Sequence, residues 1–252
     1  MYSLLPWRWI GSAVALIVAI SLYADDIGLL LGFAVTDQHL IRYLPPVLLG
    51  FLAGFFGPTG YWAPWRVVWR WIPALNRWLP DLNGVWLGAT GSNWPTIKKM
   101  LDGAQTYSVI DKEELHSTQE QVDAMAVQVT ASLFRLKVEA GLSSTDGRSH
   151  SITAKPHRDQ HSGRIHLTYV YEQTSPNPAI TDEERHMGAA DLTIDPDNLD
   201  VAQGVYWTRR NWQIGLNTAG RLELHRSAQR KEKGKSLRQY AAEEKKRLEA
   251  DS

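Results

Sequence analysis

The chain has 252 residues, no cysteine, and 27 basic and 27 acidic residues. The absence of cysteine excludes disulfide frameworks, thiol nucleophiles and cysteine-based zinc sites. The charge is uneven, because residues 81–225 hold thirteen basic and nineteen acidic residues, a net charge of −6. This acidic central region argues against a groove for polymeric nucleic acid, which needs a basic surface.

An uncharged apolar run near the start of the chain predicts a first membrane helix. Residues 9–24 form a stretch of 16 residues between Arg8 and Asp25. A cleaved signal peptide is the alternative, but Leu22 and Ala24 match the small residues required before a cleavage site poorly. We therefore expect an uncleaved helix, slightly short for a bilayer, whose flanking tryptophan and arginine side chains reach the headgroups.

The longest uncharged stretch, residues 43–65, predicts a second membrane helix. Its 23 residues lie between Arg42 and Arg66, and about 20 apolar residues are enough for a helix to cross a bilayer. Gly50 and Gly54 lie four residues apart, so they share one helical face and allow close contact with another membrane helix. A buried helix of a soluble core is the alternative, and the flanking residues favour the membrane.

Tryptophan and arginine residues at the end of the second stretch and after it predict its orientation. Aromatic side chains favour headgroup depth, and basic residues favour the cytoplasmic side of a membrane. We therefore expect residues 1–80 to form a two-helix membrane hairpin, with both termini and the following domain in the cytoplasm. The flanking residues are Trp62, Trp65, Trp69, Trp71 and Trp78, interleaved with Arg66, Arg70 and Arg77.

From residue 81 to residue 228 apolar and polar residues alternate, which is the pattern of β-strands. Eight antiparallel strands in so small a domain favour a closed barrel, because closure leaves no exposed edge. Such a barrel encloses side chains or one small ligand; a β-sandwich is the alternative fold. The predicted strands are 82–90, 124–131, 133–140, 149–156, 163–173, 187–194, 203–210 and 220–226.

Two segments do not follow the strand pattern. Residues 95–122 mix apolar residues with lysine and glutamate, so we expect one or two inserted helices over a mouth of the barrel. Residues 229–252 are charged and predict a mainly solvated helix, or one that binds a partner or touches lipid. The predicted fold class is therefore a membrane-anchored all-β protein, with two transmembrane helices, an eight-stranded antiparallel barrel, a helical insertion and a charged helical tail.

The predicted strand at residues 204–210 has an arginine on each face. Tyr206, Thr208 and Arg210 share one face, and Arg209 lies on the opposite face. An arginine inside a barrel is costly to bury unless a carboxylate or an anionic ligand pairs with it. Whichever of the two faces points inward therefore marks a candidate anion site.

Other residues of the predicted barrel are candidate ligand contacts. Trp86 follows a glycine by two residues at the start of the first strand, as in lipocalin-like barrels, although an ordinary core tryptophan fits equally. Tyr169 and Tyr171 share a strand face, where they either stack on nucleobases or pack in the core. Ser149 and Ser151 either donate hydrogen bonds to a ligand or end a turn.

The sequence contains no pattern typical of a catalytic or metal centre. His150, His157, His161 and His166 lie close together in the sequence, but their spacings do not match a common zinc site. There is also no nucleophile elbow and no phosphate-binding glycine loop. We therefore predict that the protein is not an enzyme and uses no metal and no cofactor.

Three short motifs and the two-helix hairpin resemble a known family. The motifs are NGVWLG at 83–88, GVYWTRR at 204–210 and TAGRLEL at 218–224. With them the chain resembles the SMODS-associated, two-transmembrane, β-strand-rich effectors of bacterial CBASS antiphage defence, the CD-NTase-associated protein 15 type. The resemblance covers roughly residues 1–228. Residues 95–122 depart from the compact family pattern, which leaves open the mouth by which a ligand enters.

The resemblance implies a function in antiviral defence. The barrel of such an effector senses a cyclic di- or oligonucleotide that a partner nucleotidyltransferase, the CD-NTase, makes after infection. The membrane helices then assemble into a homo-oligomer and disrupt the inner membrane, and the cell dies before the phage matures. This outcome is abortive infection.

The resemblance also implies which residues bind the ligand. It favours the face with Arg210 as the inward one, so that the guanidinium pairs with a ligand phosphate. The threonines would donate hydrogen bonds, and the aromatic residues would pack against bases. The ligand-binding residues implied in this way, or proposed from their strand positions, are Tyr206, Thr208, Arg210, Thr218, Trp86, Tyr169, Tyr171 and Ser151.

Two other functions fit the residues. One is a membrane-tethered, lipocalin-like barrel that binds or carries a lipid or other apolar ligand, and the other is a scaffold with a filled barrel. The interior of the barrel distinguishes the three. A carrier needs an uncharged lumen, a nucleotide sensor needs an enclosed arginine, and a scaffold has no cavity.

Overall fold

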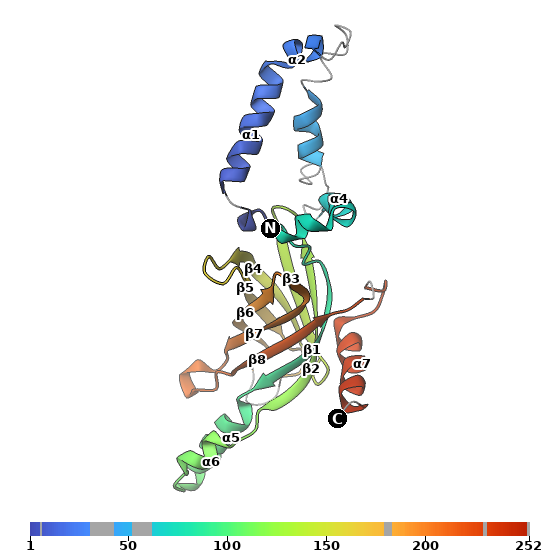
Figure 1. The fold of residues 1–252 in the computed structure, drawn as a ribbon. Helices are drawn as coiled ribbons and strands as arrows, with labels where there is room; N and C mark the ends of the chain where they lie inside the picture. Colours follow the sequence, from blue (N-terminus) through green and yellow to red (C-terminus); the bar gives the residue numbers. More distant parts are fainter. Residues whose placement is uncertain (6, 31–42, 52–61, 179–182, 229–230, 251–252) are drawn as a thin grey trace. The chain divides into compact units, whose positions relative to one another are not determined.

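The structure is a computed structural model, and Figure 1 shows its fold. The chain divides into two compact units, Met1–Asp81 with Ala131–Leu136 and Leu82–Thr130 with Lys137–Ser252. The residues that the structure describes are 1–5, 7–30, 43–51, 62–178, 183–228 and 231–250.

The first unit is helical. Residues 43–51 form part of a helix that contains Gly50, whereas Gly54 and the rest of 52–61 lie outside the described residues. No helix in the described part of the chain is both long and apolar enough to cross a membrane, so the two membrane helices stay a prediction. The other helices are η1 Tyr2–Leu4, α1 Trp7–Leu22, α2 Ala24–Leu30, α4 Trp65–Trp71 and η2 Pro73–Arg77.

The second unit is a closed barrel of eight antiparallel strands. Each strand pairs with the next in chain order, and β1 closes the barrel by pairing with β8. This confirms the predicted eight-stranded barrel and excludes the sandwich. The strands are β1 Gly84–Ser92, β2 Gln121–Ala131, β3 Leu136–Leu142, β4 Arg148–Arg158, β5 Ile165–Thr174, β6 Arg185–Asp195, β7 Asn198–Arg209 and β8 Ala219–Arg226.

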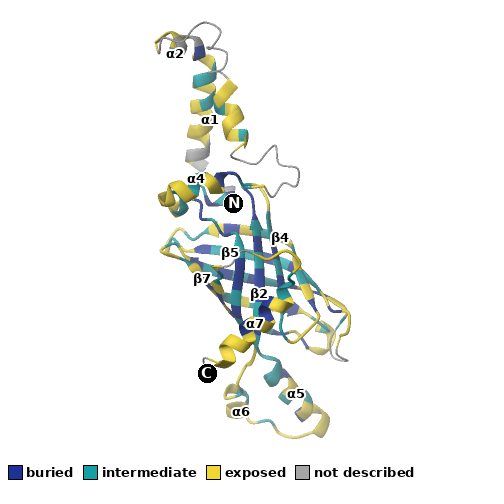
Figure 2. Ribbon diagram, turned by 90° about the vertical axis from the view of Figure 1, so that its right-hand side faces the viewer, coloured by how far each residue is buried: buried dark blue, intermediate teal, exposed yellow. Residues whose placement is uncertain are grey.

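The inward side chains change in character along the barrel axis. On β5, Ile165 and Leu167 come first and are almost completely buried, Tyr169 and Tyr171 follow, and Gln173 comes last. Since successive side chains of a strand point to opposite faces, these five residues line the same interior. Figure 2 shows the buried positions alternating with less buried ones along the strands. One half of the barrel is therefore filled with hydrocarbon, and the other half is more polar.

Neighbouring strands repeat this gradient. On β6, which runs antiparallel to β5, the inward residues run from His186 to Leu192 and Ile194. On β8 the two inward leucines, Leu222 and Leu224, are 2% and 1% exposed, as the alternation of this strand predicts. The filled half thus lies where β1, β3, β5 and β7 begin, and the polar half lies where these strands end.

Trp86 closes the filled end of the barrel. Its indole Nε1 donates a hydrogen bond to the Leu82 carbonyl oxygen at 3.3 Å, and the guanidinium carbon of Arg226 lies 4.8 Å from the ring centroid. A guanidinium over an indole face is a favourable cation–π contact. Gly84 has a φ of +143°, a conformation that residues with a side chain rarely adopt. The glycine therefore lets the chain turn into β1 just before the tryptophan.

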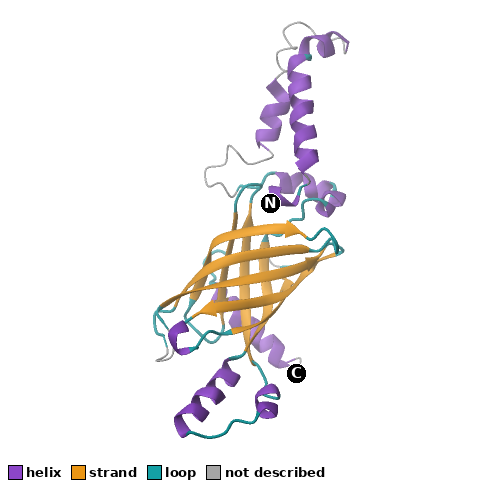
Figure 3. Cartoon of the chain, turned by 90° about the vertical axis from the view of Figure 1, so that its left-hand side faces the viewer, coloured by secondary structure: helices purple, strands orange, loops and turns teal. Residues whose placement is uncertain are grey.

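Two helices connect β1 to β2, where the insertion was predicted. They are α5 Trp94–Thr106 and α6 Lys112–His116, and they extend from the end of the barrel at which β1 ends (Figure 3). Asn93 fixes the start of α5, because its N–H donates to the Ala219 carbonyl at 3.0 Å and its Oδ1 accepts from the Ala219 N–H at 2.9 Å. The insertion is therefore tied to the polar end of the barrel.

The C-terminal helix α7, Leu237–Ala250, packs on the outside of the barrel. Tyr240 and Ala241 are buried against Val85 and Ala126, which lie on β1 and β2, and Figure 1 shows α7 beside these strands. The Tyr240 hydroxyl oxygen accepts a hydrogen bond from the Glu232 N–H at 2.8 Å. The predicted helix is confirmed and most of its residues are exposed, but a few apolar residues dock one of its faces on the barrel, a contact that the charged sequence did not predict.

We expect Tyr240→Ala to release α7 from the barrel. Removing a buried aromatic side chain costs about 3–5 kcal/mol, and a helix of this length is marginal without its packing partner. Hydrogen–deuterium exchange should show faster exchange over residues 237–250, while the strands keep their protection. Leu248→Ala, at a side chain that is 36% exposed, is the matched control and should leave exchange unchanged. Equal protection of α7 in Tyr240→Ala and the wild type would contradict this account of docking.

Candidate ligand-binding site

Two adjoining cavities occupy the polar half of the barrel. The inner cavity measures about 70 Å³ and the outer one about 230 Å³. Together they reach only the lower end of the roughly 300–1,000 Å³ that is typical of ligand pockets. The residues that line both cavities are Thr90, Leu142, Gln173, Tyr206 and Arg210.

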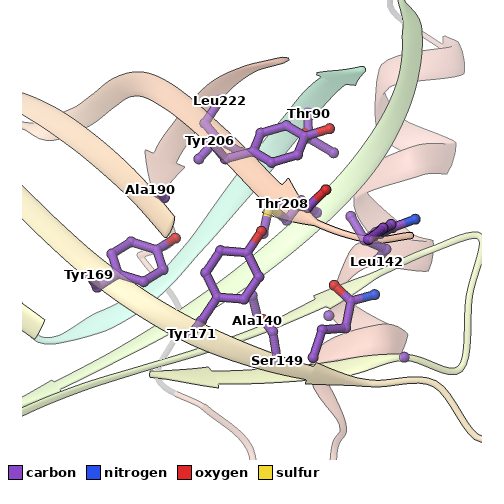
Figure 4. A pocket seen from close by; sticks show the side chains of 15 residues that line it. Thr90, Ala140, Leu142, Ser149, Tyr169, Tyr171, Ala190, Tyr206, Thr208 and Leu222 are labelled. Carbon is purple, nitrogen blue, oxygen red and sulfur yellow. The ribbon is translucent and has the colours of Figure 1, made fainter. Parts of the chain in front are cut away.

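Three tyrosines form much of the inner cavity wall. Tyr169 and Tyr171 lie on β5 with their ring centroids 5.9 Å apart and their planes at 47°, and Tyr206 lies on β7. Figure 4 shows the three rings directed into one space. Gly188 of β6 pairs with Tyr171, and a Cβ atom at this position would lie 2.5 Å from the Tyr171 ring. The glycine therefore makes room for the ring.

Burial disfavours the ionised form of two tyrosines in the inner cavity. Burial raises the pKa of Tyr169 and of Tyr171 well above the ordinary value for tyrosine, because the phenolate loses its hydration. The nearby positive charge of Arg210 opposes this rise at Tyr171 only in part. Both phenols therefore stay protonated at pH values where a free tyrosine would ionise, and they are able to donate hydrogen bonds.

Six polar side chains on the cavity wall keep their hydrogen-bonding capacity. The structure records no side-chain hydrogen bond between them and any other residue that it describes. Buried polar groups of proteins normally have a partner, and polar groups that converge on an otherwise apolar cavity are typical of ligand sites. The six residues are Thr90, Ser149, Tyr169, Tyr171, Gln173 and Tyr206.

Arg210 stands at the mouth of the inner cavity, directly after β7. Its Nε donates a hydrogen bond to Nε2 of the buried His186 at 3.1 Å, so this ring nitrogen acts as an acceptor. Its backbone N–H donates to Asn217 Oδ1 at 3.0 Å. Val205 and Trp207 are 50% and 49% exposed, so the face with Arg210 is the inward one. The guanidinium is half-buried and lines both cavities.

The two predicted threonines hold the β7–β8 hairpin together. The hydroxyl oxygens of Thr208 and Thr218 lie 2.9 Å apart, and the Thr208 hydroxyl also donates to the Thr218 carbonyl at 3.2 Å. The Thr218 N–H donates to the Thr208 hydroxyl oxygen at 3.0 Å. Thr208 lines the inner cavity and Thr218 the outer one, but their hydroxyl donors already serve the hairpin.

Trp86 and Ser151 are not brought to this site. Trp86 lies at the filled end of the barrel and is not among the residues that line the two cavities. The Ser151 hydroxyl accepts a hydrogen bond from the Val138 N–H at 2.9 Å, next to an irregularity in the pairing of β4 with β5. Both residues therefore have a structural role here.

Several lining residues were not singled out from the sequence. Gln173 could have been predicted from the sequence, because it lies two residues after Tyr171 and therefore on the same face of the strand as Tyr169 and Tyr171. Asp123 was not, since it reaches the outer cavity through contacts between distant segments: it accepts hydrogen bonds from the hydroxyls of Ser143, at 2.5 Å, and Ser144. Other residues of the outer cavity are Ser92, Trp94, Gln121, Thr145 and Leu216.

The histidines of β4 and β5 lie away from the cavities. The rings of His157 and His166 are stacked with centroids 5.0 Å apart, and His166 Nδ1 lies 2.9 Å from an oxygen of Asp191. The Thr168 hydroxyl donates to the other oxygen of this carboxylate at 2.8 Å. Within the described residues no group of three or more His, Cys, Asp or Glu side chains is placed to hold a metal ion.

The site is equipped for binding a mixed ligand. The inner cavity offers aromatic and small apolar surface with phenol, hydroxyl and carboxamide groups, and a permanent positive charge stands at its mouth. The outer cavity adds hydroxyl, amide and carboxylate groups. Such a lining suits a molecule that joins a flat aromatic part to a polar, anionic part.

Comparison with known proteins identifies the family. Residues 101–226, half of the chain, match the sequence model described as Cap15, cyclic dinucleotide receptor domain. CD-NTase-associated protein 15 of Escherichia albertii is 30% identical over 149 residues, which are 59% of this chain and 63% of that relative. The match thus spans less than two thirds of the relative's length. It confirms the resemblance seen in the motifs, and the chain belongs to the Cap15 cyclic dinucleotide receptor domain family.

Proposed function

We propose that this chain is a CBASS effector and a receptor rather than an enzyme, whose barrel binds a cyclic di- or oligonucleotide made by a partner CD-NTase. The observation that carries this proposal is the half-open lumen, where three tyrosines and Gln173 wall a cavity that has Arg210 at its mouth. Membership in a family described as a cyclic dinucleotide receptor supports the ligand class.

The two cavities suit different parts of such a ligand. A nucleobase is flat and aromatic, so it favours the inner cavity with Tyr169, Tyr171 and Tyr206, where stacking is worth roughly 1–3 kcal/mol per base. A phosphodiester favours Arg210, whose planar guanidinium matches two phosphate oxygens. The combined volume is small for a whole cyclic dinucleotide, so the remainder of the ligand lies at the mouth.

The alternative of a lipid carrier fits this lumen less well. An acyl chain would cover the hydroxyls of Tyr169, Tyr171 and Ser149 and the carboxamide of Gln173 without offering them hydrogen bonds. Each buried polar group that loses water without gaining a partner costs about 1–3 kcal/mol. A ligand with hydroxyl, amino and phosphate groups avoids this cost.

The proposal extends to the cell inner membrane. The apolar runs of residues 9–24 and 43–65 are proposed to form a multi-pass anchor of two helices, with both termini and the barrel in the cytoplasm. Val14, Leu16 and Leu22 of α1 are 52%, 61% and 68% exposed, an arrangement that suits contact with lipid. The acidic barrel disfavours polymeric nucleic acid as a partner.

Ligand binding is proposed to drive the helices into a homo-oligomer that disrupts the membrane and causes abortive infection. A ligand shifts an equilibrium only by the difference in its affinity for the two states. A hundredfold preference for the assembled state would contribute about 2.7 kcal/mol per protomer, and assembly multiplies this contribution. The face with Gly50 and Gly54 is the proposed contact between helices.

Arg210→Ala should weaken binding of a cyclic dinucleotide at least about tenfold, because a hydrogen bond to a charged group contributes roughly 1.5–3 kcal/mol. The measurement is isothermal titration calorimetry on the full chain in detergent. Ligand-induced toxicity in cells that express a partner CD-NTase should be lost in parallel.

Arg209→Ala is the matched control for this substitution. Arg209 is adjacent in sequence but exposed on the outer face of β7, so its removal should leave affinity and toxicity unchanged. Wild-type affinity in a folded Arg210→Ala variant would remove Arg210 from the site.

Gly50→Leu should abolish ligand-induced leakage of liposomes that contain the full chain, and leave ligand affinity unchanged. The added side chain would hold the helices apart at the proposed contact. Leu48→Phe adds bulk on the opposite side of the same helix and should retain leakage. Undiminished leakage in Gly50→Leu would exclude this face as the contact.

A further inference from the structure

We infer that Gln173 is the residue that reads the base of the ligand, and that it favours adenine. The inference rests on the proposed function and adds a preference for one base to it. Gln173 is the last inward residue of β5, and it lines both the inner and the outer cavity. A base that enters the inner cavity therefore passes beside its carboxamide.

The lining of the two cavities orients the ligand with its base inward. The inner wall combines the tyrosine rings with apolar groups such as Met125, Ala140 and Leu222. The outer wall holds hydroxyl groups and the carboxylate of Asp123. A base loses little hydration on entering the apolar part, whereas a ribose or a phosphate loses much more. The base edge then comes to rest at the junction of the two cavities, where Gln173 lies.

The Gln173 carboxamide is available for a ligand. In the described part of the chain the structure records no hydrogen bond from this side chain. Its neighbour across the β4–β5 ladder is Ser149, which also lines the inner cavity. The side chain is half-buried, so leaving both ends of the amide without a partner inside an occupied cavity would be costly. A bound base relieves this cost if it offers a donor next to an acceptor.

Adenine offers this pair on the edge that carries N7. Its N6 amino group donates and its N7 accepts, which matches the carbonyl oxygen and the NH₂ group of a glutamine in a bidentate contact. Guanine presents two acceptors, O6 and N7, on the same edge and is matched by arginine or lysine instead. The arginine of this site, Arg210, is assigned to the phosphate. Among the polar side chains that line the inner cavity, Gln173 is the carboxamide, so it is the one that presents a donor beside an acceptor to the base.

The test compares Gln173→Leu with the wild type, using 3′,3′-cyclic di-AMP and 3′,3′-cyclic di-GMP as probes. Affinities are measured by calorimetry on the full chain in detergent. We expect the wild type to prefer cyclic di-AMP, and Gln173→Leu to lose about tenfold or more of that affinity with little change for cyclic di-GMP. Gln173→Glu, which keeps the shape but cannot donate to N7, should lose the preference as well.

Gln203→Leu is the matched control, because Gln203 lies on β7 with its side chain exposed on the outer face; it should bind as the wild type does. Equal midpoint temperatures of thermal unfolding in the variants and the wild type would show that the barrel is intact. A wild-type preference for cyclic di-GMP, or an equal loss of both ligands in Gln173→Leu, would overturn the assignment of Gln173. If the wild type binds neither probe, the preference for adenine is overturned; the proposed function falls only if the wild type also fails to bind the cyclic nucleotide made by its partner CD-NTase.

Discussion

The rest of the molecule depends on one constraint, the change from apolar to polar inward side chains along the barrel axis. Closure of β1 on β8 forces every second side chain into one lumen, whose volume must be filled or hydrated. From Trp86, Ile165 and Leu167 at one end the filling is complete, and it gives way to tyrosine, glutamine and arginine at the other. The packed half stabilises the barrel, so the open half can keep polar groups for a ligand.

Contacts outside the lumen hold the β3–β4 turn in place at the polar end of the barrel. The turn between β3 and β4 contributes Ser144 and Thr145 to the outer cavity, and Asp123 of β2 bonds to the hydroxyl of Ser144. Arg238 of α7 forms an ion pair with Asp146 in the same turn. The insertion starts at the same end, where Trp94 lines the outer cavity. The insertion therefore begins beside the outer cavity, at the polar end of the barrel.

Much of the barrel was predictable from alternation alone. The eight predicted strands lie over the eight observed ones. The cost of burying an arginine marked the strand at 204–210 as a candidate site, but it was the family resemblance that favoured the face with Tyr206, Thr208 and Arg210, which the structure places inward. Alternation along a strand shows which side chains point inward. It does not show which of them pack in the filled half of the barrel and which line the cavities. For this reason Trp86 was predicted as a ligand contact although it plugs the far end, and Gln173 was passed over. The docking of α7 was missed because its contact depends on a few residues and on the shape of the barrel surface.

The most direct test of the central claim is an experimental structure of the full chain with a cyclic dinucleotide bound. The account predicts one base inside the barrel, in contact with the rings of Tyr171 and Tyr206, and a phosphate oxygen within about 2.7–2.9 Å of the Arg210 guanidinium. A ligand bound on the outer surface of the barrel, or a lumen unchanged by saturating ligand, would contradict it.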